Sequence, residues 1–203
     1  MGIGTGLLLF LLLSAHVDQG EGTPMSRERD SVHIIVDFAD TAEIDRWVTV
    51  NDNVMGGVSE GRASLAEDGN MLFSGSISFE NNGGFASIRA RLEDSDLGKY
   101  EGFRIRVKGD GRIYQFRVRV DGDSDGIAFK QDFATTADTW IDIDLPFAYF
   151  LPTYRGRNLQ GVKPLNATDI GQIGFLIADR TAGPFSLIVD KITAYQLIAP
   201  VDM

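Results

Sequence analysis

Short apolar runs separated by turn residues repeat from Ser31 to the end of the chain, and this pattern restricts the fold more than any other feature. Most runs are rich in Val, Ile, Phe and Tyr, which favour β-strands. Clusters such as Asp68-Gly69-Asn70 and Asp121-Gly122 interrupt them in the manner of turns. No window keeps a helical period, although Thr41–Arg46 has room for one helical turn.

The sequence therefore predicts an all-β protein, either an antiparallel sandwich or a barrel. The expected strands are 32–38, 47–50, 61–65, 71–79, 85–92, 103–108, 114–120, 127–133, 140–145, 171–178 and 185–197.

The side chains available for chemistry are restricted, because the chain has no cysteine and only two histidines, His16 and His33. Disulfides, thiol nucleophiles, iron–sulfur ligation and cysteine-based zinc sites are excluded, and a Ser-His-Asp triad would depend on His33 alone. The net charge of −10 argues against nucleic acid or an anionic membrane as the main partner. Composition thus favours a binding or assembly role, and we expect no enzymatic activity.

The first fifteen residues carry no charged side chain and include the apolar run Leu7–Leu13. This run is too short to span a bilayer, but it has the length of the apolar part of a signal peptide. We expect a signal peptide at 1–15, a flexible segment at 16–30 and a single β-sandwich domain at 31–203. The protein would then be exported (periplasmic or secreted) and would not be an integral membrane protein. If translation starts at Met25 instead, the protein is cytoplasmic.

Alternation along 103–108 and 114–120 places apolar side chains on one strand face and cations on the other. The turn Gly109-Asp110-Gly111 between them predicts a hairpin whose cations share one sheet face. The segment 86–92 adds two arginines, so that a basic surface would accept an anionic ligand or an acidic partner segment. Alternatively, Asp142 and Asp144 pair with these cations across the sheet. The candidate cations are Arg89, Arg91, Arg104, Arg106, Lys108, Arg117 and Arg119.

A possible calcium loop follows the second of these strands, with carboxylates spaced as hard oxygen ligands for the ion. The candidate ligands are Asp121, Asp123, Asp125 and Asp132. The alternative is a solvated acidic hairpin loop with no bound metal. Apart from calcium, no cofactor is expected.

Two polar loops, 51–59 and 81–87, each contain paired glycines beside Asn or Asp. The side chains of Asp52, Asn53, Asn81 and Asn82 are candidates to line a polar binding cleft. The structural alternative is that they hold long turns at the ends of a sandwich by bonding to neighbouring amides. A hydrolase that uses Asp52 and Glu80 as an acid pair is a third hypothesis, but no spacing supports it.

These loops, together with several later segments in the same order, resemble the complex I intermediate-associated protein 30 family. The resemblance covers residues 36–197. Its motifs are WVTVNDNVMGGVS (47–59), FSGSISFENNGGFASIR (73–89), GDGRIY (109–114), LPFAYF (145–150), RGR (155–157), IGFLIAD (173–179) and GPFSL (183–187).

The resemblance implies a jelly-roll β-sandwich similar to galactose-binding domains. It also implies a chaperone-like assembly factor of the NADH dehydrogenase complex, which binds unfolded or partly assembled protein and has no catalytic residues to carry over. The partner is then an assembly intermediate. The alternative is an exported carbohydrate- or small-ligand-binding module, with a glycan as partner and loop aromatics as sugar platforms. The candidate platforms are Trp47, Trp140, Tyr149 and Tyr154.

Overall fold

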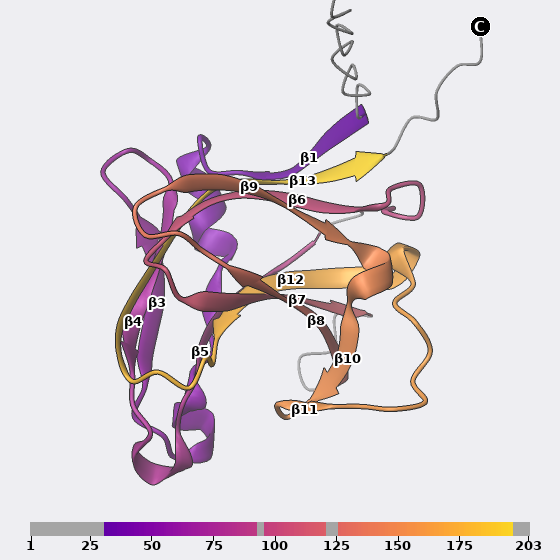
Figure 1. Cartoon of the computed structure of the whole chain (residues 1–203). Helices are drawn as coiled ribbons and strands as arrows, with labels where there is room; N and C mark the ends of the chain where they lie inside the picture. Colours follow the sequence, from indigo (N-terminus) through magenta and orange to yellow (C-terminus); the bar gives the residue numbers. More distant parts are fainter. Residues whose placement is uncertain (1–30, 93–95, 121–125, 197–203) are drawn as a thin grey trace, which may run out of the picture.

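The computed structural model describes residues 31–92, 96–120 and 126–196, which form two antiparallel β-sheets packed face to face (Figure 1). Within these ranges the only helices are short 3-10 turns, and none has the length and apolar character needed to cross a membrane. The prediction of an all-β sandwich is confirmed. Each expected apolar run overlaps a strand.

Sheet A has six strands, in the order β3-β4-β13-β6-β9, with β1 also paired to β13. The long last strand, β13, organises this sheet, because its first half pairs with β4 and its second half with β1 along the same edge. The strands of sheet A are β1 (Ser31–Asp37), β3 (Glu60–Leu65), β4 (Met71–Ile77), β6 (Gly102–Gly109), β9 (Trp140–Pro146) and β13 (Gly183–Gln196).

Sheet B has seven strands, in the order β11-β10-β8-β7-β12-β5-β2. The strands of sheet B are β2 (Val48–Thr49), β5 (Ala86–Arg91), β7 (Ile113–Val120), β8 (Ala128–Ala134), β10 (Leu151–Tyr154), β11 (Arg157–Asn158) and β12 (Ile170–Ile177). The short hairpin β10–β11 was not among the expected strands. It turns at Arg155 and Gly156, both of which have positive φ.

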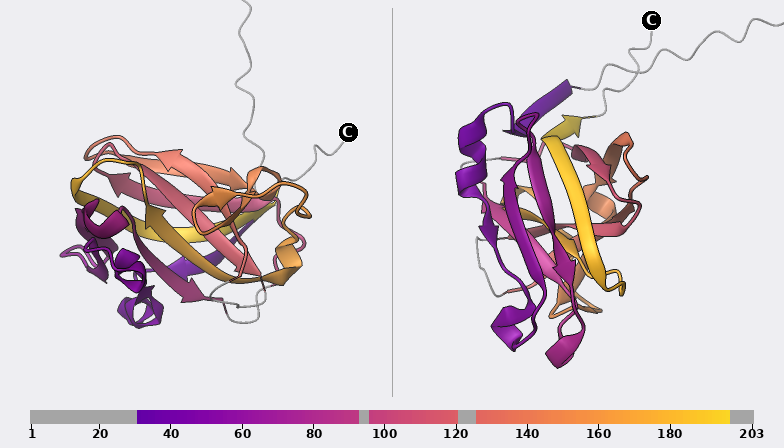
Figure 2. Two further views of the ribbon diagram at one scale, coloured as in Figure 1. Left: turned by 90° about the horizontal axis from the view of Figure 1, so that it is seen from below. Right: turned by 90° about the vertical axis from the view of Figure 1, so that its left-hand side faces the viewer.

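In the part of the chain that the structure describes, five 3-10 turns connect the strands: η1 (Thr41–Arg46), η2 (Asp52–Met55), η3 (Glu80–Asn82), η4 (Phe147–Tyr149) and η5 (Ala167–Asp169). The first confirms the single helical turn expected there, and the Asp40 carboxylate caps it by accepting a hydrogen bond from the Ala42 N–H. Turns η2 and η3 project together at one end of the sandwich, at the lower left of Figure 1 and at the bottom of the right-hand view in Figure 2.

The predicted hairpin between 103–108 and 114–120 is wrong, because β6 belongs to sheet A and β7 to sheet B. The connection at Asp110 and Gly111 crosses from one sheet to the other. The apolar faces of both strands still point into one core, where the rings of Phe103 and Phe116 lie 5.2 Å apart. The cations of β6 and β7 therefore lie on opposite outer surfaces of the molecule.

Candidate functional site

A buried carboxylate joins the two polar loops that the sequence singled out. The side chain of Asp52, at the start of η2, is 1% exposed. Its Oδ1 accepts a hydrogen bond from the Ser59 N–H at 2.9 Å, and its Oδ2 accepts from the N–H groups of Gly84 and Phe85 at 2.6 and 3.3 Å. One side chain thus closes its own loop and holds the η3 loop against it. We call this arrangement the Asp52 clasp.

Two glycines are required for the Asp52 clasp, because each approaches the carboxylate too closely for a larger residue. A Cβ atom on Gly57 would lie 2.4 Å from the Asp52 Cγ, and one on Gly83 would lie 2.6 Å from its Oδ2. Burial alone would raise the pKa of Asp52. The hydrogen bonds from Ser59, Gly84 and Phe85 outweigh burial and hold the pKa below its ordinary value, so the carboxylate is charged at neutral pH.

The neighbouring amide of Asn51 extends this network toward the sheets. Its Nδ2 donates to the Gly61 carbonyl at 3.0 Å, and its Oδ1 accepts from the Ser87 N–H at 3.3 Å. Because Gly61 lies in sheet A and Ser87 in sheet B, the amide connects the two sheets at this end of the sandwich. The loop motif is therefore a structural element of the fold.

The structure brings the four candidate cleft residues onto one pair of loops, but they do not share one role. Asn53, Asn81 and Asn82 are exposed, whereas the Asp52 carboxylate faces inward and bonds to backbone amides. Asn81 and Asn82 have φ of 54° and 60°, a left-handed conformation that Asn tolerates better than most residues. Glu80 is exposed, so the acid pair Asp52/Glu80 is not a pair of facing carboxyls available to a substrate.

Four apolar side chains project into solvent from the loops that the Asp52 clasp holds. Their exposed fractions are 69% for Val54, 67% for Met55, 46% for Val58 and 48% for Phe79. We call this group the apolar loop tip. Exposed apolar clusters mark protein or ligand contacts when they lie together on a fixed scaffold. The sequence carries a signal for them, because Val54 and Met55 lie between three Asn/Asp residues and two glycines, a composition typical of loops.

A second network fixes the connections between the sheets near the same end. The Arg112 guanidinium forms a largely buried ion pair with Asp179, with Nη2 2.6 Å from Oδ1, and also donates to the Pro184 carbonyl at 2.8 Å. The Asp110 carboxylate accepts from the Tyr114 hydroxyl at 3.1 Å and from the Ser186 N–H at 2.8 Å. Segments 109–114 and 179–186 thus hold each other in place.

The candidate cations of β6 are partnered on the outer surface of sheet A. Arg104 Nε lies 2.5 Å from Asp144 Oδ1, and Arg106 Nη1 lies 3.1 Å from Asp142 Oδ2. Lys108 lies over the ring of Trp140, 5.5 Å from its centre. The alternative in which β9 carboxylates pair with these cations is therefore confirmed for Arg104 and Arg106.

The other candidate cations lie on the outer surface of sheet B, which the left view of Figure 2 faces. Strand register places Arg89, Gly174, Arg117 and Lys130 in one row across β5, β12, β7 and β8. Arg91 and Arg119 flank Gln172 in the next row. We call this surface the sheet B outer face.

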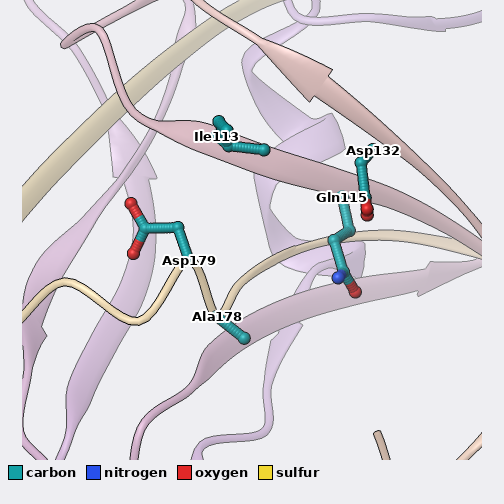
Figure 3. Close-up of a pocket in the computed structure, with 5 residues that line it drawn as sticks. All are labelled: Ile113, Gln115, Asp132, Ala178 and Asp179. Carbon is teal, nitrogen blue, oxygen red and sulfur yellow. The ribbon is translucent and has the colours of Figure 1, made fainter. Parts of the chain in front are cut away.

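A small pocket of about 110 Å³ lies toward one end of the sheet B outer face (Figure 3). Gln115 and Asp132, which face each other across β7 and β8, form part of its wall. The remaining lining residues are Ile113, Ala178 and Asp179. The pocket thus adjoins both the ion pair of Arg112 and the cationic row.

Three of the four candidate calcium ligands, Asp121, Asp123 and Asp125, lie outside the described residues. The fourth, Asp132, is on β8 and forms an ion pair with Lys130, whose Nζ lies 3.0 Å from Oδ2. Within the described ranges, no group of three or more His, Asp or Glu side chains is arranged to hold a metal ion.

The candidate aromatic platforms occupy different environments. Trp47 is 7% exposed and packs in the core against Phe175, and Trp140 lies beneath Arg106. Tyr154 is in contact with Arg155. Tyr149, on η4, is 68% exposed. It lines a pocket of about 510 Å³, together with Tyr100, Glu101, Phe147, Asn166, Thr168 and Tyr195, among others. In Figure 1, η4 lies at the right, opposite the end from which η2 and η3 project.

The sequence also resembles named proteins. A mitochondrial complex I intermediate-associated protein 30 from Mus musculus is 24% identical over 204 residues, which cover 89% of this chain and 62% of that protein. A probable family member from Caenorhabditis elegans, also named mitochondrial, is 29% identical over 152 residues, or 64% of this chain and 44% of that protein. The chain thus spans less than two thirds of the length of these relatives.

Solved structures with a similar fold include carbohydrate-binding modules and agarases. A family 11 carbohydrate-binding module from Clostridium thermocellum, in complex with a mixed-linked tetrasaccharide, has a TM-score of 0.63 and 19% identity. The match covers 82% of this chain and 96% of that module. An agarase matches 84% of this chain with a TM-score of 0.56 and 12% identity, over 25% of its own length. The expected jelly-roll sandwich similar to galactose-binding domains is confirmed.

The family model of complex I intermediate-associated protein 30 matches residues 36–189, most of the described sandwich. The matched range contains both loops of the Asp52 clasp and the Arg112–Asp179 network. The chain therefore belongs to the complex I intermediate-associated protein 30 family.

Proposed function

We propose that this domain is a non-enzymatic, chaperone-like interaction module that binds incompletely assembled subunits during assembly of respiratory complex I. Membership of the family supports the link to complex I. The names of the relatives place those proteins in mitochondria. Export, by contrast, rests on a leader that lies outside the described residues, and it stays a prediction.

The main support for the proposal is the exposure of the side chains in the apolar loop tip. Its side chains extend into solvent from two loops that the Asp52 clasp fixes in place, so ordering them upon binding costs little further entropy. Apolar surface that a partner covers contributes roughly 25 cal/mol per Å². Such a surface suits an apolar patch that a subunit exposes before its final neighbour is in place.

Photo-crosslinking tests this assignment directly. A photoreactive amino acid at Met55 should crosslink to complex I subunits in native membranes. A matched position is Leu151, which is also exposed, at 52%, but lies on β10 away from the tip. Crosslinks to complex I subunits from Met55 but not from Leu151 are expected. Equal yields from both positions, or crosslinks from Met55 to unrelated proteins alone, would contradict the proposal.

A second candidate function, carbohydrate binding, is favoured by the pocket of about 510 Å³ around Tyr149. The exposed ring of Tyr149, beside Glu, Asn and Thr side chains, provides a stacking surface next to hydrogen-bond partners for hydroxyl groups. The fold likeness to a carbohydrate-binding module supports the same candidate, although a shared fold does not transfer a binding site.

A glycan array with the wild-type protein and a Tyr149→Ala variant tests this second candidate. Specific binding that the variant loses would support it, and an array without binders would exclude it for the glycans present. The Met55 crosslinks are unaffected in either case, so the two candidates are tested independently.

A further inference from the structure

Arg117, at the centre of the sheet B outer face, differs from its neighbours Lys130 and Arg119, which have an ion-pair or hydrogen-bond partner. Arg117 lies on β7, and its side chain is half-buried against the sheet. Within the described ranges, its guanidinium makes no hydrogen bond or ion pair. A guanidinium has five N–H donors, and burying them unpaired opposes folding.

The charges around Arg117 do not neutralise it. The nearby carboxylate of Asp132 is in an ion pair with Lys130, at 3.0 Å. Arg119, two residues along the same face, donates from Nη1 to the Gly126 carbonyl at 2.6 Å and is a like charge. Burial, and then the charge of Arg119, lower the pKa of Arg117 to about 10. The attraction of the Asp132 carboxylate offsets only part of these two effects. The guanidinium remains charged at neutral pH and forms no ion pair within the described ranges.

A second polar group without a partner lies beside it. Gln172, on β12, is 6% exposed, and its Oε1 has no hydrogen-bond partner. It is opposite Arg119 in the strand register, which places it diagonally from Arg117, within reach for side chains of this length. The residue of β12 directly opposite Arg117 is Gly174, so no side chain from that position stands between Arg117 and Arg89.

We propose that the sheet B outer face binds a small ligand that carries an oxyanion group, phosphate or carboxylate, next to a hydroxyl group. The oxyanion accepts hydrogen bonds from the Arg117 guanidinium, whose planar fork matches such groups. The ligand hydroxyl donates to Gln172 Oε1 once the side chains over that atom rotate. This site lies on a different surface from the apolar loop tip, and it does not depend on the proposed role in assembly.

Isothermal titration calorimetry with four probes tests the proposal: inorganic phosphate, D-glucose 6-phosphate, uncharged D-glucose and a hexaglutamate peptide. Wild-type protein should bind glucose 6-phosphate more tightly than phosphate and should not bind glucose. Arg117→Met should weaken glucose 6-phosphate binding at least tenfold. It should leave the melting temperature unchanged or raised, because it removes an unpaired, partly buried charge. Gln172→Leu should weaken glucose 6-phosphate binding but leave phosphate binding unchanged.

The matched control is Arg104→Met, on the outer surface of the other sheet, which should change affinity less than twofold. An equal loss in the Arg104 and Arg117 variants would show diffuse charge attraction and overturn the site. Binding of hexaglutamate alone would overturn it in favour of an acidic protein segment, and no binding of any probe would overturn it outright. If Gln172→Leu weakens both anions equally, the hydroxyl contact is wrong.

Discussion

At the scale of single residues, Asp52 combines a negative charge with nearly complete burial, an arrangement that is costly unless the charge is hydrogen-bonded. Three backbone N–H groups from two loops supply those bonds. The carboxylate therefore acts as a fixed acceptor that determines where η2 and η3 lie. The exposed side chains of the apolar loop tip depend on it for their position.

Replacing Asp52 with Asn should destabilise the fold by about 2–4 kcal/mol, because the amide turns a donor toward N–H groups that need acceptors. Urea unfolding of the two proteins measures this difference. Asn53→Ala is the matched control, since its side chain is exposed and its loss should change the free energy by less than about 0.5 kcal/mol. Equal effects of the two substitutions would show that the hydrogen bonds to Asp52 contribute nothing.

Asp52 also predicts how stability depends on pH. Its pKa in the folded protein lies below the ordinary value of 3.8, so the unfolded chain binds the proton more readily. The stabilisation is therefore complete above the unfolded pKa and is lost as the pH falls through the folded pKa. Denaturant unfolding between pH 2 and pH 7 should show a steeper acid loss for wild type than for Asp52→Asn. Parallel curves would contradict the assignment.

The buried ion pair of Arg112 and Asp179 leads to a third prediction. Arg112→Met leaves the Asp179 carboxylate buried without its partner, which should cost about 3–5 kcal/mol. The double variant Arg112→Met/Asp179→Leu removes both charges and should recover most of that loss. Thermal or urea unfolding of the three proteins checks this, and a double variant no more stable than the single one would refute the reasoning.

At the scale of elements, residue alternation predicted the strands and their buried faces but not which sheet each strand joins. Phe103 and Phe116 both face the core, as alternation requires, yet they face it from opposite sheets. A tight Gly-Asp-Gly turn fits a hairpin and a crossing between sheets equally well in sequence. The Asp110 carboxylate accepts a hydrogen bond from the Ser186 N–H, 76 positions away, and this contact favours the crossing between sheets. Local sequence does not reveal such a contact.

The apolar loop tip was missed for a related reason. Exposed Val54 and Met55 look like core residues in composition, and only the inward-facing Asp52 shows that their loop points outward. The hairpin β10–β11 was missed because Pro152 interrupts a very short strand. The pairing of Asp142 and Asp144 with arginines, by contrast, follows from alternation on β6 and β9 and was anticipated.

Between neighbouring strands, we expect ion pairs on the surface to contribute little to the free energy of unfolding. Asp144 pairs with Arg104 on the outer surface of sheet A, where the two side chains are 49% and 31% exposed. Asp144→Ala should therefore reduce the free energy of unfolding by less than about 1 kcal/mol. A loss of several kcal/mol in urea unfolding would mean that this pair stabilises sheet A far more than its exposure suggests.

At the scale of the whole molecule, the sandwich separates its surfaces. The apolar loop tip lies on the loops of η2 and η3, and the pocket around Tyr149 adjoins η4. These turns lie at opposite ends of the sandwich (Figure 1). The cationic row crosses the sheet B outer face, which the left view of Figure 2 faces. The net charge of −10 conceals this distribution. A domain of this kind is able to contact a protein partner through its tip while its sheet surfaces remain accessible.

The most direct test of the central claim is complementation in cells that lack the endogenous protein. A Val54→Ser/Met55→Ser/Phe79→Ser variant is compared with a Leu151→Ser control, after both are shown to melt like wild type. Complex I abundance on native gels is the readout. The control should restore the amount of assembled complex I. With the triple variant, assembly intermediates of complex I should persist on the gel. Full restoration by the triple variant would contradict a role for the apolar loop tip in assembly.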